Sequence, residues 1–368
     1  NLWLIEGEMP DDNDKHPDLA NALVYRRDDR LYLMDTGAGP RLRAGIERAL
    51  RDAGPAQVFT LLNSHGHLDH VGNNGLIRTV QADEKHHYLS KAGWPFLDVV
   101  PWAADLYTRA GEYYDPFAAF QAHRLKYRAA GVLRDGLALF VGQRRAMETL
   151  MSAVGFEKKW GPISLSQETI RSYETLPRQK IRFGDVTWSG WILGDDDVWV
   201  LEERGHSPDE VLFYVPEHRF LHTADLTFAL FPTWPDSDGR TIRRALRKCM
   251  AMARAGDVQL LTDGHHHHVY RGRDEIVTFL ETLLSDHELF RDVLDEILEE
   301  QDGLTVPQVY ARLRERREPV VRKYLDLEFP HTPPSLQAVI AMCLLDMGYE
   351  AKGPWRRKRF YRLHQNTD

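Results

Sequence analysis

Apolar positions in the first part of the chain form short strand-like runs and, between them, a stretch with helical spacing. Residues 22–25 and 31–34 are short apolar runs with strand character, and a charged turn separates them. Residues 41–54 carry apolar side chains at helical spacing and end at a glycine, which is a common helix stop. Residues 56–63, AQVFTLLN, return to a strand-like run. The pattern predicts strands and helices in alternation.

Further strand-like runs occur in the second half of the chain. They are residues 197–203, 210–215, 219–224 and 258–263. The second and third are separated only by the residues PEH, which indicates a β-hairpin. Between about residues 91 and 180 the strand pattern stops, and aromatic residues gather on stretches with helical spacing. We therefore expect a β-rich domain over residues 1–285 with a helical insertion at 91–180.

The aromatic residues of this insertion have two interpretations. Either they form its own hydrophobic core, or some of them line an apolar pocket over a site, as residues of inserted segments often do. The residues are Trp94, Phe96, Trp102, Tyr107, Tyr113, Tyr114, Phe117, Phe120, Tyr127, Phe140, Phe156 and Trp160. Both interpretations stay open at the level of sequence.

The C-terminal part, residues 286–368, has a helical texture and ends in a basic segment. Two helical stretches precede a segment that suits a β-hairpin or wing, and this order resembles a winged helix. Such a module often binds nucleic acid, and the basic residues RRKR at 356–359 are able to touch phosphate. The central stretch PSLQAVIAMCLLDMGYE is mostly apolar, however, which suits a core or the subunit interface of a homo-oligomer.

The composition is that of an ordinary globular chain. Of its 368 residues, 43% are hydrophobic, and no apolar run reaches the roughly 18 residues of a transmembrane helix. The net charge of −8 disfavours general attraction to nucleic acid or to an acidic membrane. Cys249 and Cys343 are too few for a disulfide framework and fit a reducing compartment. No signal-like pattern follows Asn1. We expect a cytoplasmic protein without a membrane partner.

The most distinctive stretch of the chain follows the strand-like run at residues 56–63. In HGHLDH, His65 and His67 are two residues apart, so an extended backbone points both imidazoles the same way. Asp69 and His70 fall where the chain turns and can serve a second ion nearby. Imidazole and carboxylate suit zinc, and also iron or manganese. A polar loop that happens to be rich in histidine explains this density less well.

Three later residues share one context, a position just after the end of a predicted strand. They are His206, Asp225 and His265. Glycine precedes both histidines and allows the backbone angles of a tight ligand loop. His265 opens a run of four histidines, so His266 is an alternative ligand at the same place.

Together these pieces resemble the metallo-β-lactamase fold superfamily. SHGHLDHVGN is similar to its HxHxDH signature. The other pieces come in that superfamily's order: DTG at residues 35–37, GHSP at 205–208, AD at 224–225 and GH at 264–265. The resemblance covers roughly residues 1–90 and 181–285 and leaves out the insertion and the tail. It implies an α+β fold, a four-layer αββα sandwich with the site at one edge of two packed sheets.

The resemblance also implies a role for each residue. The ligands divide into two sets and a bridge: His65, His67 and His206 for one ion, Asp69, His70 and His265 for the second, and Asp225 for both. Asp35 matches an early aspartate that orients a ligand, and Asp69 matches a carboxylate that orients hydroxide and moves a proton. Both ions are expected to be divalent, with zinc first and iron or manganese as alternatives.

The expected function is that of a dinuclear metal-dependent hydrolase. A hydroxide that bridges the ions would attack a small, apolar or aromatic substrate at an ester, thioester, lactone, amide or related bond. The second histidine of HxHxDH argues against the di-iron flavoproteins of this fold, which resemble HxExDH. The alternative is a nucleic-acid-directed phosphodiesterase or nucleic-acid-binding protein that uses the winged-helix-like region. Asp209 and Glu210 follow GHSP where small residues are common, and they either tune a ligand or face solvent.

Overall fold

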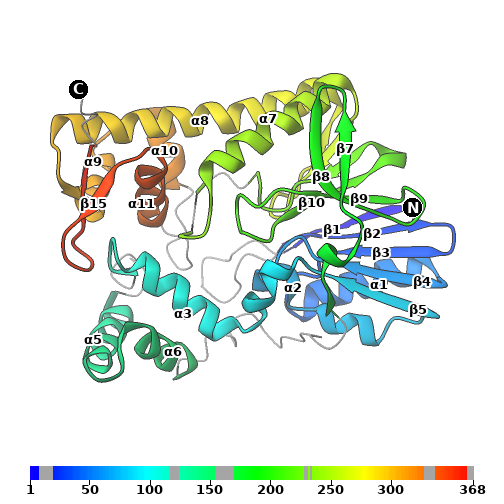
Figure 1. The fold of residues 1–368 in the computed structure, drawn as a ribbon, viewed down its shortest axis with the longest axis horizontal. Helices are drawn as coiled ribbons and strands as arrows, with labels where there is room; N and C mark the ends of the chain where they lie inside the picture. Colours follow the sequence, from blue (N-terminus) through cyan, green and yellow to red (C-terminus); the bar gives the residue numbers. More distant parts are fainter. Residues whose placement is uncertain are drawn as a thin grey trace. The chain divides into compact units, whose positions relative to one another are not determined.

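Two large β-sheets share a hydrophobic core, and they are drawn on the right of Figure 1. The structure is a computed structural model, which describes residues 1–7, 20–116, 124–153, 170–227, 231–232, 234–326 and 336–362. The first sheet consists of β1 (Leu2–Ile5), β2 (Ala22–Arg27), β3 (Arg30–Met34), β4 (Val58–Leu62), β5 (Glu84–Tyr88) and β6 (Ile170–Arg171), in that order. The pairs from β1 to β3 are antiparallel, and those from β3 to β6 are parallel. The predicted strands at 22–25, 31–34 and 56–63 are thus confirmed.

The second sheet has the order β13-β12-β11-β10-β9-β8-β7. Its strands are β7 (Gln179–Phe183), β8 (Val186–Leu193), β9 (Val198–Glu202), β10 (Val211–Val215), β11 (Phe220–His222), β12 (Leu260–Thr262) and β13 (Tyr270–Arg271). All pairs are antiparallel except β11 with β12. A short turn at Pro216–His218 joins β10 to β11, which confirms the predicted hairpin.

Alternation along the strands places one hydrophobic core on each face of the first sheet. Along β3, Tyr32 and Met34 belong to the core shared with strands of the second sheet. Leu31 and Leu33 point the other way and pack with the apolar face of helix α1 (Pro40–Ala53). Because side chains alternate between the two faces of a strand, one strand serves both cores. The helix predicted at residues 41–54 therefore covers the first sheet.

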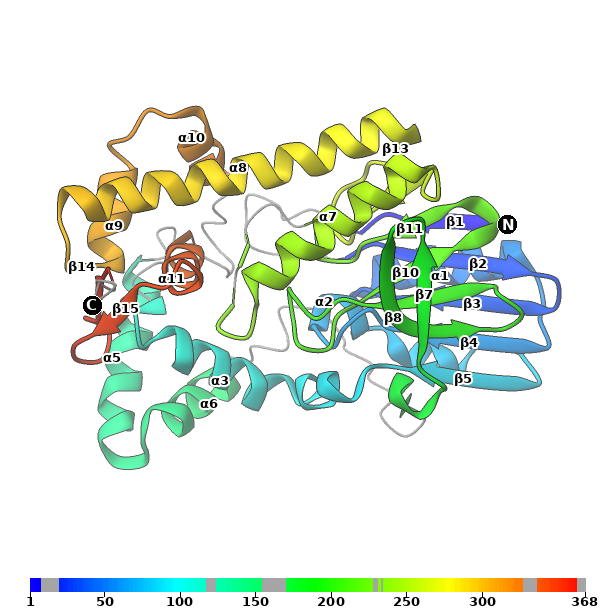
Figure 2. The same ribbon diagram turned by 45° about the horizontal axis from the view of Figure 1, so that its top comes forward.

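A second helix covers the outer face of the second sheet (Figure 2). Trp188 of β8 donates its indole N–H to Met252 of α7 (Gly239–Ala255) at 3.2 Å, and Lys248 of α7 lies over the same ring. Trp191 points to the opposite face of β8, into the core shared by the two sheets. Helix, sheet, sheet and helix thus follow one another, and the predicted four-layer αββα sandwich is confirmed.

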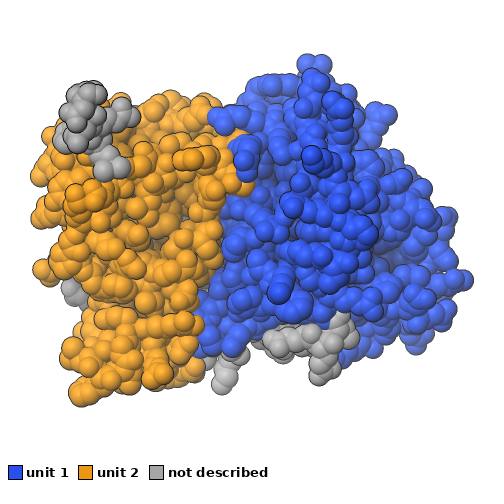
Figure 3. Space-filling view, viewed as in Figure 1, with its two compact units in different colours: residues 1–102, 155–228, 244–281 blue, residues 103–154, 229–243, 282–368 orange. Residues whose placement is uncertain are grey.

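Contacts within the chain divide it into two units (Figure 3). Unit 1 comprises Asn1–Trp102, Gly155–Phe228 and Arg244–Glu281 and contains both large sheets. Unit 2 comprises Ala103–Val154, Ala229–Arg243 and Thr282–Asp368. The domain boundary between residues 285 and 286 stays a prediction. Among the residues that the structure describes, no helix is long and apolar enough to cross a membrane.

Unit 2 is mainly helical. Its helices are most of α3 (Val99–Ala110), then α5 (Arg124–Val141), α6 (Gln143–Ala153), the second half of α8 (Gly272–Glu300), α9 (Val306–Leu313), α10 (Pro319–Asp326) and α11 (Leu336–Asp346). The predicted helical character of the insertion is thus confirmed over α3, α5 and α6. Phe117, Phe120, Phe156 and Trp160 of the predicted aromatic set lie outside the described residues.

The C-terminal segment of unit 2 ends in a small sheet. The strands β14 (Leu304–Thr305), β15 (Glu350–Lys352) and β16 (Arg359–Tyr361) pair in the order β14-β16-β15. Helix α11 precedes β15 and is buried on every side from Leu336 to Leu344. A helix that is apolar all round belongs in a core. The apolar stretch in the tail therefore forms interior structure of unit 2.

Basic residues of the tail are paired with acidic residues of the insertion, inside unit 2. The Arg356 guanidinium binds both carboxylate oxygens of Asp135, at 2.6 and 2.8 Å. Lys358 binds Glu112 at 2.5 Å, and Arg359 donates to the carbonyl oxygen of Gly303. Three of the four residues of RRKR thus have partners within their own unit.

Candidate metal centre

The predicted ligands come together at one edge of the two sheets, where several strands end. His65 and His67 follow β4, and the short helix α2 (Leu68–Val71) carries Asp69 and His70. The other three follow β9, β11 and β12, and they are His206, Asp225 and His265. The strands fix the backbone on one side of each residue, and the loops let the side chains converge. All seven residues predicted as ligands lie in this cluster.

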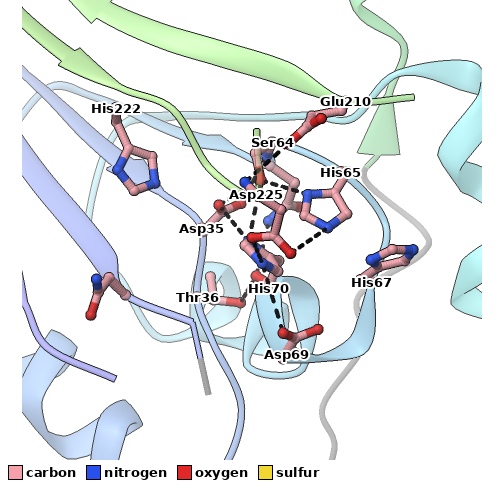
Figure 4. A network of polar contacts seen from close by, with 12 residues as sticks. Asp35, Thr36, Ser64, His65, His67, Asp69, His70, Glu210, His222 and Asp225 are labelled. Carbon is pink, nitrogen blue, oxygen red and sulfur yellow. Dashed lines mark hydrogen bonds and ion pairs between the residues drawn. The ribbon is translucent and has the colours of Figure 1, made fainter. Parts of the chain in front are cut away.

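His65, His67, His206 and Asp225 form one group with metal-binding geometry. Figure 4 labels His65, His67 and Asp225 of this group. Their candidate ligand atoms all lie within 4.8 Å of one another, and all four residues are buried. Nε2 of His206 is 3.1 Å from Nδ1 of His67 and 3.3 Å from Oδ2 of Asp225. Nε2 of His65 is 3.9 Å from the same carboxylate oxygen. Two imidazoles thus approach the same oxygen of Asp225, and the third, that of His67, lies beside His206.

Asp69, His70, His265 and Asp225 form the second group. Nε2 of His70 is 3.0 Å and Nε2 of His265 is 3.1 Å from Oδ1 of Asp225. Oδ2 of Asp69 is 3.5 Å from the same nitrogen of His265. The two oxygens of Asp225 therefore face different groups, which is the arrangement that a bridging carboxylate requires.

The imidazoles of the first group are in the protonation state that binds a cation. Burial, followed by the charges of neighbouring histidines, holds the pKa of His65 and His67 well below the ordinary value. Burial lowers the pKa of His206 to about 4. These imidazoles are therefore neutral near pH 7. Within the described part of the chain, Nε2 of His65 is buried without a hydrogen-bond partner. A neutral imidazole whose lone pair meets no donor fits a divalent ion.

In the second group, neighbouring carboxylates shift the pKa of a histidine upward instead of downward. Burial alone would lower the pKa of His70, but Asp225, Asp35 and Asp69 outweigh it and raise the pKa well above its ordinary value. The carboxyl of Asp225 loses solvation by burial, yet His265, His70 and His206 hold its pKa well below the usual range. The three carboxylates around His70 stabilise a positive charge at this place. A bound metal ion would supply that charge and displace the proton from His70.

Asp35 forms hydrogen bonds with one candidate ligand and with the residue that precedes another. Its Oδ1 accepts a hydrogen bond from the backbone N–H of Ser64 at 2.8 Å, and its Oδ2 accepts one from the Ser64 hydroxyl at 2.6 Å. Oδ2 also lies 2.9 Å from Nδ1 of His70, on the ring edge opposite to the one that faces Asp225 (Figure 4). A carboxylate on one imidazole nitrogen fixes the tautomer and leaves the other nitrogen to face an ion. This geometry fits the orienting role predicted for Asp35.

Gly264, which precedes His265, is required for a different reason from the one expected from the sequence. Its backbone is not left-handed, but a Cβ at Gly264 would lie 2.6 Å from Oδ1 of Asp225 and 3.1 Å from a carbon atom of His70. Close approach, rather than unusual backbone angles, therefore requires glycine at this position.

The run of histidines separates into one residue inside the cluster and three outside. His265 belongs to the second group. Nδ1 of His266 instead lies 2.6 Å from Asp263, and Nε2 of His268 lies 2.7 Å from Glu275. His267 approaches Glu6 at 4.0 Å. The geometry therefore favours His265 over His266 as a ligand.

We expect His265→Ala to bind less metal than the wild type and His266→Ala to bind as much as the wild type. The reason is that only the His265 imidazole faces Asp225 and Asp69. Elemental analysis of the two variants, prepared side by side, measures this directly. Equal metal content in both variants, or loss in His266→Ala alone, would contradict the assignment.

Asp209 and Glu210 are functional candidates for which the sequence left two interpretations open. Both are fully buried, so neither faces solvent. Glu210 also forms a hydrogen bond with Glu203, and burial together with the charge of Glu203 raises its pKa well above the ordinary value. One proton between the two carboxyl groups makes such a contact possible. Both Asp209 and Glu210 accept hydrogen bonds from the backbone beside candidate ligands.

Two aromatic residues lie against the first group. The rings of Phe96 and Trp102 are 5.6 and 5.1 Å from the ring of His67, and they are 5.2 Å from each other. Both residues belong to the predicted aromatic-rich insertion, and nothing in the sequence distinguishes them from its other aromatic residues. Their contact with the ring of His67 distinguishes them in the structure. We call Phe96 and Trp102 the aromatic wall.

Comparison with known proteins agrees with this fold and site. Residues 17–145, which include HxHxDH, match the family model described as metallo-beta-lactamase superfamily. No curated protein matches the chain. A metallo-β-lactamase family protein of Thermus thermophilus is similar in structure, with 16% identity, a TM-score of 0.52, and coverage of 98% of both chains. A β-lactamase domain protein of Burkholderia ambifaria has 15% identity and a TM-score of 0.55, over 98% of this chain and 91% of its own.

A third solved structure is an enzyme of stated activity. The stereoselective inverting sec-alkylsulfatase of Pseudomonas sp. has 13% identity and a TM-score of 0.50, over 88% of this chain and 47% of its own. At such identities the likeness shows the fold. The chain thus has the metallo-β-lactamase fold, and over residues 17–145 it is similar in sequence to the superfamily of that name.

Proposed function

We propose that this protein is a metal-dependent hydrolase that holds two divalent ions. The observation that carries the proposal is the carboxylate of Asp225. Its Oδ2 lies 3.3 Å from His206 of the first group, and its Oδ1 lies 3.0 and 3.1 Å from His70 and His265 of the second. In this assignment the first ion takes His65, His67 and His206. The second takes Asp69, His70 and His265. Zinc suits the ligand types best, with iron or manganese as alternatives.

Such ions, when bound, lower the pKa of a coordinated water and polarise the bond that is to be cleaved. The chain itself supplies orientation and proton transfer. Asp69 is the least buried member of the two groups, with 17% of its side chain exposed, so it can exchange a proton with solvent or substrate. We assign it the role of moving that proton. Asp35 keeps the Nε2 edge of His70 directed at the site.

The aromatic wall supports a small substrate with an apolar or aromatic part. Phe96 and Trp102 extend an apolar surface directly from His67. Such a surface binds a flat or apolar group by burial and ring contact. An ester, thioester, lactone, amide or sulfate ester that carries such a group meets this description.

The contacts of the tail favour a structural role over nucleic-acid binding. Arg356 and Lys358 are held by Asp135 and Glu112 of the insertion, so their charges are already compensated within unit 2. We propose that residues 286–368 form a winged-helix-like module that stabilises the insertion. Cys249 and Cys343 are buried free thiols, in keeping with the cytoplasmic location predicted from the sequence.

A panel of substrates on metal-loaded protein tests the function. The panel contains aryl and alkyl esters, thioesters, lactones, β-lactams, aryl and alkyl sulfates, and a phosphodiester as the nucleic-acid-like member. We expect turnover of at least one small apolar or aromatic member. Trp102→Ala should raise KM for that substrate by about tenfold, because one lost ring contact is worth roughly 1 kcal/mol or slightly more.

The matched control is Trp94→Ala, since Trp94 is 42% exposed and has no ring contact with His67 among those described. It should leave KM unchanged. Turnover of the phosphodiester alone, or an equal change of KM in both variants, would overturn the proposed substrate class.

A further inference from the structure

A pair of adjacent buried carboxyl groups connects the segments that carry the candidate ligands. Glu210 accepts a hydrogen bond from the backbone N–H of His206 with Oε2 at 3.1 Å. It accepts a second from the backbone N–H of Asp225 with Oε1 at 3.0 Å. His206 follows β9 and Asp225 follows β11, so one side chain holds two ligand loops that leave different strands.

Asp209 likewise forms a hydrogen bond with the backbone of the segment that follows β4. Its Oδ2 accepts a hydrogen bond from the backbone N–H of Gly66 at 2.7 Å, and Gly66 stands between His65 and His67. Its Oδ1 accepts one from the hydroxyl of Ser207 at 2.7 Å. A Cβ at Gly93 would come within 2.1 Å of Oδ2, so the carboxylate has no room to shift toward that side.

We propose that Asp209 and Glu210 are positioning residues that set the geometry of the metal centre. Between them they hold three ligand-bearing segments, at Gly66, His206 and Asp225, through hydrogen bonds to the backbone. Neither residue belongs to the two groups of side chains that are able to hold an ion. They act through the ligands, whose spacing they fix. The inference rests on the proposed function, since it takes these segments to bind metal.

The energetics of burial support this role. Both carboxyl groups are buried, and Glu210 also lies beside Glu203 and Asp225, so they cost free energy unless hydrogen bonds satisfy them. Apolar residues would fill the same space at lower cost, so a purely space-filling role does not explain acidic side chains here. Bonds from neighbouring groups to ligand segments typically change metal affinity by about 10- to 100-fold when they are removed.

The chain offers variants that separate hydrogen bonding from bulk. Asp209→Asn keeps an oxygen for the N–H of Gly66, and its amide can donate to Ser207, so both contacts survive. Asp209→Ala removes both. Glu210→Gln keeps one acceptor oxygen for two backbone donors, and Glu210→Ala keeps none. Gly93→Ala leaves both acids in place but pushes the Asp209 carboxylate with its new Cβ.

The test is a titration of metal-free full-length protein with Co²⁺, followed by visible absorption. Competition for Zn²⁺ against a chromophoric chelator gives the affinity. Melting of each metal-free variant is recorded alongside, so that loss of fold is seen separately. Asp197→Asn is the matched control, because Asp197 is also fully buried and accepts from Arg30 and Tyr32, away from the ligand segments.

We expect Asp209→Ala, Glu210→Ala and Gly93→Ala to lower Zn²⁺ affinity by about 10- to 100-fold and to change the Co²⁺ spectrum. Glu210→Gln should be intermediate, and Asp209→Asn should stay close to wild type. Asp197→Asn should lower the melting temperature alone. Wild-type affinity and spectrum in Asp209→Ala and Glu210→Ala, with only a lower melting temperature, would overturn this inference and leave the proposed function intact. Wild-type protein that takes up no ion would overturn the proposed function, and this inference with it.

Discussion

Asp225→Ala is expected to lose both bound ions and nearly all activity. Its carboxylate is the only side chain shared by the two groups of candidate ligands. Without it, His206 and His70 lose the anion that lies 3.3 and 3.0 Å away and that would balance the charge of each ion. Metal content by elemental analysis should fall for both ions together. Turnover should fall by at least about 10³-fold, because two ions stabilise the transition state by several kcal/mol.

The conservative variant Asp225→Asn serves as the control for this experiment. It keeps the shape of the side chain and one carbonyl oxygen but lacks the negative charge. We expect it to retain more metal than the alanine variant and less than wild type. If Asp225→Ala instead keeps both ions and its full rate on every substrate that the wild type cleaves, the two-ion arrangement is wrong.

Asp69→Asn is expected to impair turnover more than metal binding. The first group of ligands does not include Asp69, so the ion held there should remain. The second ion keeps His70, His265 and Asp225 and should bind more weakly. Loss of a group that transfers a proton lowers kcat by roughly 10²- to 10⁴-fold. Metal content and kcat, measured on the same sample, test both statements.

Asp52→Asn is a suitable comparison, because Asp52 is an exposed carboxylate on α1, outside both groups. It should change neither quantity. Asp69→Asn with a wild-type kcat and reduced metal content would show that Asp69 is a ligand without a role in proton transfer. A full complement of both ions and a wild-type kcat would remove it from the site.

The sequence was sufficient to predict the residues that share a local signature. His65, His67, Asp69 and His70 occupy one short stretch after an apolar run, and the remaining candidates each follow a predicted strand. Parallel and antiparallel strands that end at the same edge bring such residues together, so spacing and strand pattern carry the information. The strand-like runs likewise predicted individual strands, and the resemblance to the superfamily implied that they pack as two sheets.

The contacts that support the site depend on partners far away in the chain. Asp209 is buried because it meets Gly66, 143 positions earlier. Its immediate neighbours in the sequence are compatible with a solvated turn as well as with burial. The same holds for the aromatic wall and for the pairing of Arg356 with Asp135, which are 221 positions apart. Charge and hydrophobicity of a residue do not reveal which surface it will meet.

The burial of α11 has a consequence for how the protein can be shortened. Cys343 of this helix contacts the backbone of Phe231, and Asp346 at its end binds Arg243, so the helix supports segments that precede it by about a hundred residues or more. A chain cut before Leu336 would leave these apolar and charged surfaces uncovered in water, and an uncovered apolar surface of this kind promotes aggregation. Ending the protein just before α11 would therefore yield an insoluble product rather than a shorter enzyme.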